Sequence, residues 1–314
     1  MKQFIIIATL LISSCNTIPE QQIIQTPPKP VERPPTCCAN PPSRKCDDFH
    51  TEVTQTLQAK NLDDLTQWLV RLKKQSDCSA DYLYQLKRNI SDIAAAKATD
   101  LVQRGQLEEA DKWLQHQYTP IKSWTTQRVR GDIAAKRQQW KPAAKFYNQA
   151  LDLLNDAAEK PSPAEIEKIQ KLAIETQLLD GTLIASFSDS KTNPIPVTFA
   201  PAKTQLTNNG KKLAKQLAHY LWQKNVNQIT LIGHTDGTGS DAYNCELSKN
   251  RALALKKYLL EKGVHAKITT LGKGKREPFQ LSDPTRYTQT EIDQINRRVE
   301  FVIDREISYD NICL

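Results

Sequence analysis

The residue types best able to recognise a charged ligand follow one apolar segment of the chain. We expect Gly233 to let the backbone turn where a strand ends, because a residue without a Cβ avoids a clash there. Thr235 and Asp236 then project from the carboxyl edge of the strand. Asn244 is predicted to cap the next helix, and Arg251 lies about two turns inside it. A carboxylate and a guanidinium should therefore face one small pocket.

Such a pocket would complement a zwitterion, a molecule that carries both an ammonium and a carboxylate. Asp236 would take the ammonium, and Arg251 would take the carboxylate through two parallel hydrogen bonds. We expect Leu247 to supply an apolar wall and Arg298 to lie near the pocket from the last strand. The alternative is that Asp236 and Arg251 pair with each other as a structural salt bridge.

Other chemistry is weakly supported by this part of the chain. The glycines at 233–239 superficially resemble a phosphate-binding loop, but the Lys-Ser/Thr pair that holds a terminal phosphate is missing. His234 lies beside Asp236 without a credible nucleophile, so we predict that it packs rather than catalyses. No glutamate pair suited to cleaving a glycan can be identified. The sequence favours a binding protein over an enzyme and indicates no cofactor and no metal.

These residues have to be positioned by a domain that we place at 194–305, followed by a tail at 306–314. Alternating apolar residues predict strands, and leucines spaced by three or four residues predict helices. In chain order, the predicted elements are strand 195–199, helix 206–221, strand 228–232, helix 247–259, strand 266–271 and, after a long loop, strand 299–303. This βαβαβ–β order favours an α+β fold in which helices cover one face of the sheet.

Three motifs occur together in this domain. They are residues 233–252, 272–278 and 296–300. Together they closely resemble the OmpA-like peptidoglycan-binding domain, which also occurs in Pal lipoproteins and in the flagellar stator protein MotB. The resemblance covers about residues 195–304 and implies an OmpA-like α/β sandwich. It also implies that Asp236 and Arg251 bind the diaminopimelate of the peptidoglycan stem peptide.

One departure from the family pattern concerns the affinity for the cell wall. In many relatives, a polar side chain follows the phenylalanine of the first strand and reaches the ligand. Here Phe199 is followed by Ala200, Pro201 and Ala202. Any contact from this loop would have to come from backbone groups, so we expect a weaker grip than in relatives that keep the side chain.

The first residues of the chain indicate its compartment. A lysine precedes an apolar run at 4–12, which is too short to span a bilayer and is typical of a secretory signal peptide at 1–14. Residues 12–15 resemble a bacterial lipobox, so we predict that Cys15 carries lipid, palmitate included. Asn16 stands where an aspartate would favour the inner membrane. We therefore expect an outer-membrane lipoprotein that faces the periplasm; the alternative is an ordinary signal peptide with a chance cysteine.

Export makes disulfides the expected state of the other six cysteines, because an oxidising compartment preserves them. These are Cys37, Cys38, Cys46, Cys78, Cys245 and Cys313. Six thiols allow fifteen pairings, among which the sequence does not choose. A bond between Cys245 and Cys313 would pin the C-terminus to the start of a helix. A zinc site built by the first four cysteines is the alternative, although paired C-x-x-C spacing is missing.

A tether and a helical module precede the C-terminal domain. The tether, at 15–47, carries seven prolines between 27 and 42, which disfavour helix and favour extended conformations. The module, at 48–185, is rich in Leu, Ala, Gln, Lys and Glu and contains few glycines. This composition predicts helices.

Internal similarity within the module indicates repeats. Residues 98–114 recur at 131–147, displaced by 33 positions (131 minus 98), in a pattern that looks tetratricopeptide-like. Gln138 replaces the glycine expected at the turn of the second copy. We predict a small α-solenoid. The large residues expected in its core are Trp68, Trp113 and Trp140.

The sequence thus predicts an α+β multidomain protein that anchors the outer membrane to peptidoglycan without catalysis. A net charge of +8 favours an anionic partner, and the resemblance favours the wall polymer over nucleic acid. The expected partners are peptidoglycan, the membrane through Cys15, and a protein bound by residues 48–185. The alternative is a scaffold or accessory subunit of a secretion or motility complex, in which wall binding only positions the helical repeats. A wall hydrolase with its site hidden at 48–190 is the third hypothesis.

Overall fold

The computed structural model describes residues 45–156, 160–181, 193–195, 199, 202–304 and 310–313. The chain divides into two units, 1–43 and 44–314, and the described residues all belong to the second. The predicted signal peptide, the lipidated Cys15 and the tether up to residue 44 lie outside the described residues. So do Ala200, Pro201 and most of the predicted first strand after Ile195.

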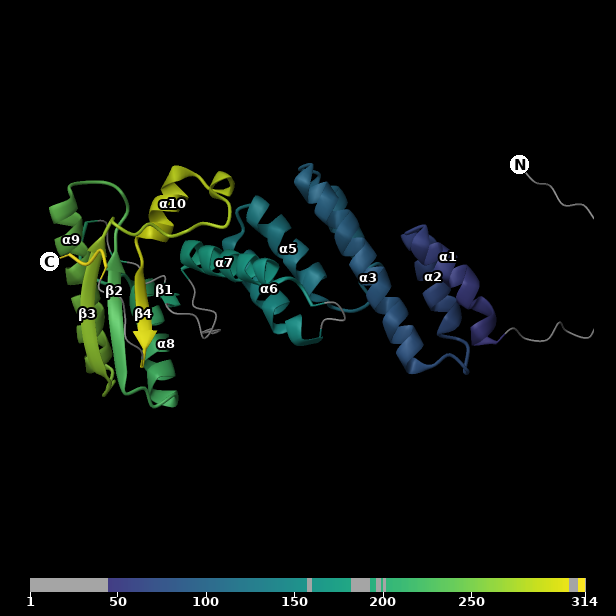
Figure 1. Ribbon diagram of the computed structural model, residues 1–314, viewed down its shortest axis with the longest axis horizontal. Coiled ribbons are helices and arrows are strands. Elements are labelled where there is room, and N and C mark those ends of the chain that lie inside the picture. Colours follow the sequence, from purple (N-terminus) through teal and green to yellow (C-terminus); the bar gives the residue numbers. More distant parts are fainter. Residues whose placement is uncertain are drawn as a thin grey trace, which may run out of the picture. The chain divides into compact units, whose positions relative to one another are not determined.

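Among the described residues, seven α-helices follow one another between residues 50 and 180 (Figure 1). They are α1 His50–Gln58, α2 Leu62–Leu72, α3 Ala80–Gln103, α4 Leu107–Trp113, α5 Trp124–Lys136, α6 Trp140–Asp152 and α7 Pro163–Asp180, with 3-10 turns at Cys46–Phe49 and Leu154–Asp156. Ser79, Ser123 and Ser162 cap α3, α5 and α7 by accepting a backbone hydrogen bond. None of the described helices is long and apolar enough to cross a membrane. The predicted helical module is confirmed as helical.

The two similar segments fall on matching helix pairs, α3 with α4 and α5 with α6. Tyr147 is fully buried and fills the space beside Gly131, where an added Cβ would lie 2.6 Å from the Tyr147 ring. The turns between the helices also match, because Gly105 and Gln138 both have left-handed backbone, with φ of 76° and 55°. The tetratricopeptide-like prediction is consistent with this arrangement of small and large residues.

The three tryptophans lie at the edges of the apolar cores. Trp68, Trp113 and Trp140 are half-buried and pack against buried residues of the module. The Arg71 guanidinium lies 5.1 Å from the Trp68 ring, and the Lys97 ammonium lies 3.5 Å from the Trp113 ring. The prediction that they are core residues is only partly correct, because none of the three is fully buried.

The C-terminal domain contains, among the described residues, one four-stranded sheet. Its strands are β1 Asn193–Ile195, β2 Gln228–His234, β3 Lys267–Gly274 and β4 Val299–Ile303, in the spatial order β1-β4-β2-β3. Strands β2 and β3 are parallel, and β4 is antiparallel to both of its neighbours. Helices α8 Asn208–Gln223 and α9 Asp241–Glu261 pack on the sheet through the main apolar core (Figure 1). The predicted α+β architecture is confirmed.

Two predictions about where helices and strands begin or end are wrong. Helix α9 is capped by Ser240, whose Oγ accepts a hydrogen bond from the Tyr243 backbone N–H at 3.2 Å, and not by Asn244, which lies one turn inside the helix. Gly233 lies within β2 rather than at a turn after it. In addition, Phe199 forms an isolated bridge with Leu206 instead of continuing a described strand.

The predicted long loop between β3 and β4 is partly helical. It contains a 3-10 turn at Pro284–Arg286 and helix α10 Gln289–Asn296. Helix α10 begins with a capping box between Thr288 and Glu291. With only eight residues, it presents too short an apolar pattern to be recognised by periodicity.

Two disulfides join described cysteines. Cys245 bonds to Cys313, which joins the C-terminal residues to the start of α9. Cys46 bonds to Cys78. The four-cysteine zinc site is therefore wrong, because a disulfide removes two of the thiolates that it needs. Cys37 and Cys38 lie outside the described residues.

Candidate ligand-binding site

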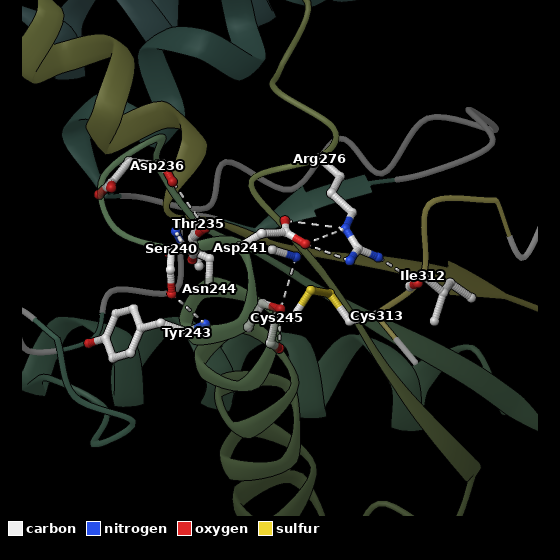
Figure 2. Close-up of a disulfide and its surroundings, with 12 residues drawn as sticks. Thr235, Asp236, Ser240, Asp241, Tyr243, Asn244, Cys245, Arg276, Ile312 and Cys313 are labelled. Carbon is white, nitrogen blue, oxygen red and sulfur yellow. Dashed lines mark hydrogen bonds and ion pairs between the residues drawn. A yellow bond between two sulfur atoms is a disulfide. The ribbon is translucent and has the colours of Figure 1, made fainter.

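A cavity of about 490 Å³ lies between the carboxyl end of β2 and the first turns of α9. Residues from several elements line it: Leu178, Phe199, Ala202, Thr235, Asp236, Thr238, Tyr243, Asn244, Leu247, Arg251, Gln294 and Arg297. Figure 2 shows the start of α9, with Asp236 and Tyr243 on one side and the Asp241–Arg276 ion pair and the Cys245–Cys313 disulfide on the other. The cavity thus brings together five of the six residues predicted to bind ligand.

Asp236 is held by hydrogen bonds at the start of the loop after β2. Its Oδ1 accepts from the Thr238 backbone N–H at 3.0 Å, and its Oδ2 pairs with Nη1 of Arg297 at 2.9 Å. Burial alone would raise the pKa of Asp236, but these partners hold the pKa below its usual value. A carboxylate has about four lone-pair positions, so an ionised Asp236 keeps acceptor capacity for a ligand.

Arg251 is buried, with 3% of its surface exposed. Its Nε donates to the Lys203 carbonyl at 3.4 Å, and its guanidinium lies 5.3 Å from the centre of the Phe199 ring. No carboxylate of the described residues forms an ion pair with it. Burial, and then the nearby Arg297, lower the pKa of Arg251 from its usual value. The alternative of a structural salt bridge between Asp236 and Arg251 is therefore not realised among the described residues, and Asp236 pairs with Arg297 instead.

The charges that line the cavity do not cancel. Arg251 and Arg297 supply two guanidinium groups, whereas Asp236 supplies one carboxylate. A guanidinium carries five N–H donors in a planar fork that matches a carboxylate. The cavity can therefore bind a ligand carboxylate at Arg251 while Asp236 accepts from a ligand ammonium.

Thr235, Asn244 and Leu247 also line the cavity. Asn244 is 1% exposed and braces the loop, since its Nδ2 donates to the carbonyls of Thr238 at 2.8 Å and Ser240 at 3.1 Å. Leu247 adds apolar surface next to Arg251. The loop is thus shaped before a ligand arrives.

Arg298 does not line the cavity, contrary to prediction, and the adjacent Arg297 does. The guanidinium of Arg298 turns to the interior and pairs with Glu300 at 2.6 Å. Arg297 directly follows the last turn of α10, with φ of −76° and ψ of 64°, so the end of that helix places its side chain. Sequence reasoning also missed Tyr243, Gln294 and Leu178.

His234 is 1% exposed and does not line the cavity, in agreement with the prediction that it packs. Its Nε2 lies 3.7 Å from Glu300. Burial, and then Arg298, lower the pKa of His234. Burial alone would raise the pKa of Glu300, but Arg298 and His234 hold this pKa well below its usual range. His234, Arg298 and Glu300 therefore form a cluster of titratable groups that does not line the cavity.

Two glycines let α9 lie directly against the sheet. A Cβ built on Gly233 would lie 2.1 Å from the Ser248 carbonyl oxygen, and one on Gly272 would lie 2.6 Å from the Ser248 Oγ. Gly233 is thus required for close helix packing, which is the physical reason for its place in the strand. This packing sets the position of Arg251, which follows Ser248 by one turn.

Comparison with known proteins assigns a family to part of this chain. The model of the OmpA family matches residues 198–289, so this part of the chain is an OmpA family domain. Outer membrane protein A of Bordetella avium is 37% identical over 102 residues, which are 32% of this chain and 50% of the relative. Outer membrane porin F of Pseudomonas aeruginosa is 34% identical over 114 residues, 36% of this chain and 31% of the relative. The chain thus spans about half the length of the first relative and a third of the second.

Solved structures give related matches. The peptidoglycan-associated lipoprotein from Burkholderia pseudomallei is 27% identical, with a TM-score of 0.30, and the match covers 37% of this chain and 91% of that one. The cell wall anchor of the T6SS from Pseudomonas aeruginosa is 26% identical, with a TM-score of 0.29, covering 37% of this chain and 80% of that one.

Proposed function

We propose that the cavity binds the peptidoglycan stem peptide non-covalently through the side chain of diaminopimelate. This side chain ends in an ammonium and a carboxylate on one carbon. The observation that supports the proposal is that Asp236 and Arg251 line one cavity while neither pairs with the other. Asp236 would accept from the ammonium, and Arg251 would donate two hydrogen bonds to the carboxylate.

The remaining predicted residues have supporting roles in this proposal. Thr235 and Asn244 hold the loop, and Leu247 packs on the methylene groups of the ligand. Arg297, rather than Arg298, orients Asp236. Binding of this kind needs no reaction, in keeping with the binding role of the OmpA family domain.

We further propose that lipid on Cys15 anchors the chain to the outer membrane, so that the chain links membrane and wall. Two attachments, one at each end, are what an envelope anchor needs. The role holds whether or not the helical repeats also recruit a protein of a larger complex. Fractionation of cells carrying Cys15→Ser tests the anchor, since the variant should leave the membrane fraction.

Co-sedimentation of the full chain with purified peptidoglycan sacculi tests wall binding. Asp236→Ala and Arg251→Ala should each lower retention by at least about tenfold, because hydrogen bonds to charged groups contribute roughly 1.5–3 kcal/mol. Asp241→Ala and Arg276→Ala are matched controls, an acid and a base that pair on the surface of the same domain outside the cavity. Unchanged retention of the two cavity variants would rule out the proposed site.

A further inference from the structure

Residues 279–297, which we call the docking segment, belong to the C-terminal domain and pack against the helical module. The segment includes α10 and packs against α7. The buried residues of this contact are Leu178, Leu179, Tyr287 and Ile295, with Trp140, Ile174, Phe279, Leu281 and Ile292 partly buried around them. The contact is therefore an apolar core shared by two parts of the chain that are distant in sequence.

Polar groups inside this contact are paired across it. Glu175 of α7 is fully buried and accepts hydrogen bonds from the Ser282 hydroxyl at 2.7 Å, the Ser282 backbone N–H, and the Tyr287 hydroxyl at 2.6 Å. Burial, and then the Glu175 carboxylate, raise the pKa of Tyr287, so the phenol remains a donor. Breaking such a contact would leave a buried carboxylate with fewer donors, which is costly. The two parts are thus held in one specific arrangement.

Gln294 extends this contact to the end of α7. Its Nε2 donates to the Leu179 carbonyl at 2.8 Å and to the Leu178 carbonyl at 3.4 Å. The last carbonyls of a helix lack partners within the helix, so Gln294 supplies a cap from another part of the chain. Both Gln294 and Leu178 line the ligand cavity.

The same segment also reaches the charged side of the cavity. Helix α10 ends at Asn296, and the next residue, Arg297, pairs with Asp236. Between Gln294 and Arg297, the docking segment therefore touches α7 on one side and the carboxylate proposed to bind ligand on the other. A displacement of α7 would move the cap, α10 and the partner of Asp236 together.

We propose that the last turn of α7 is a wall of the ligand site, with Leu178 in contact with the apolar part of the ligand, so that docking of the helical module and ligand binding are coupled. This proposal rests on the proposed function. A ligand that contacts Leu178 binds the docked arrangement better than an undocked one, and it therefore stabilises docking by that difference in affinity. The coupling is reciprocal: if the ligand favours docking of α7 by a given factor, docking raises the affinity for the ligand by the same factor.

The experiment measures binding of a soluble muropeptide containing meso-diaminopimelate to the full chain by calorimetry. Leu178→Ala should weaken binding by roughly threefold to tenfold, through lost apolar contact. Leu178→Met, which restores the volume, should recover most of the affinity. Tyr287→Phe, which removes a donor to Glu175 outside the cavity, should also weaken binding. Its control is Tyr118→Phe, which removes a hydroxyl donor to Asp63 elsewhere in the module and should leave binding unchanged.

The outcomes separate the two proposals. If Asp236→Ala binds the muropeptide as the parent does, the proposed function fails. If Asp236→Ala loses binding while Leu178→Ala and Tyr287→Phe fold and bind as the parent does, the coupling fails alone. Should the Leu178 and Tyr287 variants not fold, hydrogen exchange of the parent decides. Muropeptide should slow exchange in the last turn of α7 in the parent and not in Asp236→Ala, and the absence of slowing would overturn the coupling.

Discussion

Where the docking segment meets α5 and α6, Arg286 donates to the Tyr147 hydroxyl at 3.1 Å and pairs with Asp132 at 3.4 Å. In the neighbouring cavity, Arg251 has, among the described residues, one long hydrogen bond to a carbonyl and a ring beside it. The pKa values follow this difference. Burial lowers both, but Tyr147 and Asp132 raise the pKa of Arg286 above its usual value, whereas the pKa of Arg251 stays lowered.

The comparison shows how one fold uses buried charge in two ways. At the contact, acids and bases complement one another and hold the helical module in place. In the cavity, Arg251 forms no ion pair with a carboxylate of the described residues. A buried charge without an ion-pair partner costs stability in the free protein, because its desolvation is unfavourable. The proposed function accounts for this cost, since a ligand carboxylate would pair with the Arg251 guanidinium.

The largest expected effect is on the free energy of unfolding when each of the two arginines is replaced. Arg286→Met should lower the free energy of unfolding by about 3 kcal/mol, because it removes one partner from a buried charged cluster. Arg251→Met should change it by less than about 1 kcal/mol, or raise it, because no carboxylate of the described residues loses a partner. Urea denaturation of the full chain at neutral pH measures both.

Arg276→Met, a surface arginine of the same domain, serves as the reference for these two variants. A larger loss of stability for Arg251→Met than for Arg286→Met would contradict the comparison. It would mean that Arg251 has a structural role, and Arg251 would then no longer support the proposal of a ligand site.

A smaller effect is expected from His234, which is buried in the folded state. The pKa of His234 is lowered in the folded protein, so the unfolded chain binds a proton at a higher pH, near 6.5. The contribution of His234 to the free energy of unfolding should therefore be fully present above about pH 7. It should fall as the pH drops through 6.5, by at most about 1.4 kcal/mol per pH unit.

Urea denaturation between pH 5 and 7.5 measures this slope. His234→Gln should flatten it, whereas His219→Gln, a change at an exposed histidine of α8, should leave it in place. An identical slope in the parent and in His234→Gln would show that another group carries the pH dependence.

The parts of the site that sequence could predict are those encoded by local pattern. The spacing of Asp236 and Arg251 places both near the cavity, because a strand end and a helix face are set by neighbouring residues. The cap of α9 was predicted wrongly at Asn244, because Ser240 and Asn244 are both good capping residues and only the loop geometry separates them. No pattern in the sequence indicated that Leu178 lines the cavity. Its role arises from packing between segments more than 100 residues apart, which no local pattern records.

Arg297 and Arg298 show an intermediate case. The sequence placed Arg298 near the pocket, but Arg297 lines it, because Arg297 directly follows the end of α10 and β4 begins only at Val299. Helix α10 has only eight residues and gave no recognisable pattern, so the motif alone could not choose between the two arginines.

The smallest expected effect concerns the two repeats, where the same turn is built from different residues. Gly105 and Gln138 both have positive φ, which costs a side-chain-bearing residue but not glycine. Gln138→Gly should raise the free energy of unfolding by up to about 1 kcal/mol, and Gly105→Ala should lower it by about 1 kcal/mol. Gln139 is the matched control, because its φ of −89° suits any residue, so Gln139→Gly should give no gain. Equal effects at 138 and 139 would mean that backbone strain does not distinguish the two repeats.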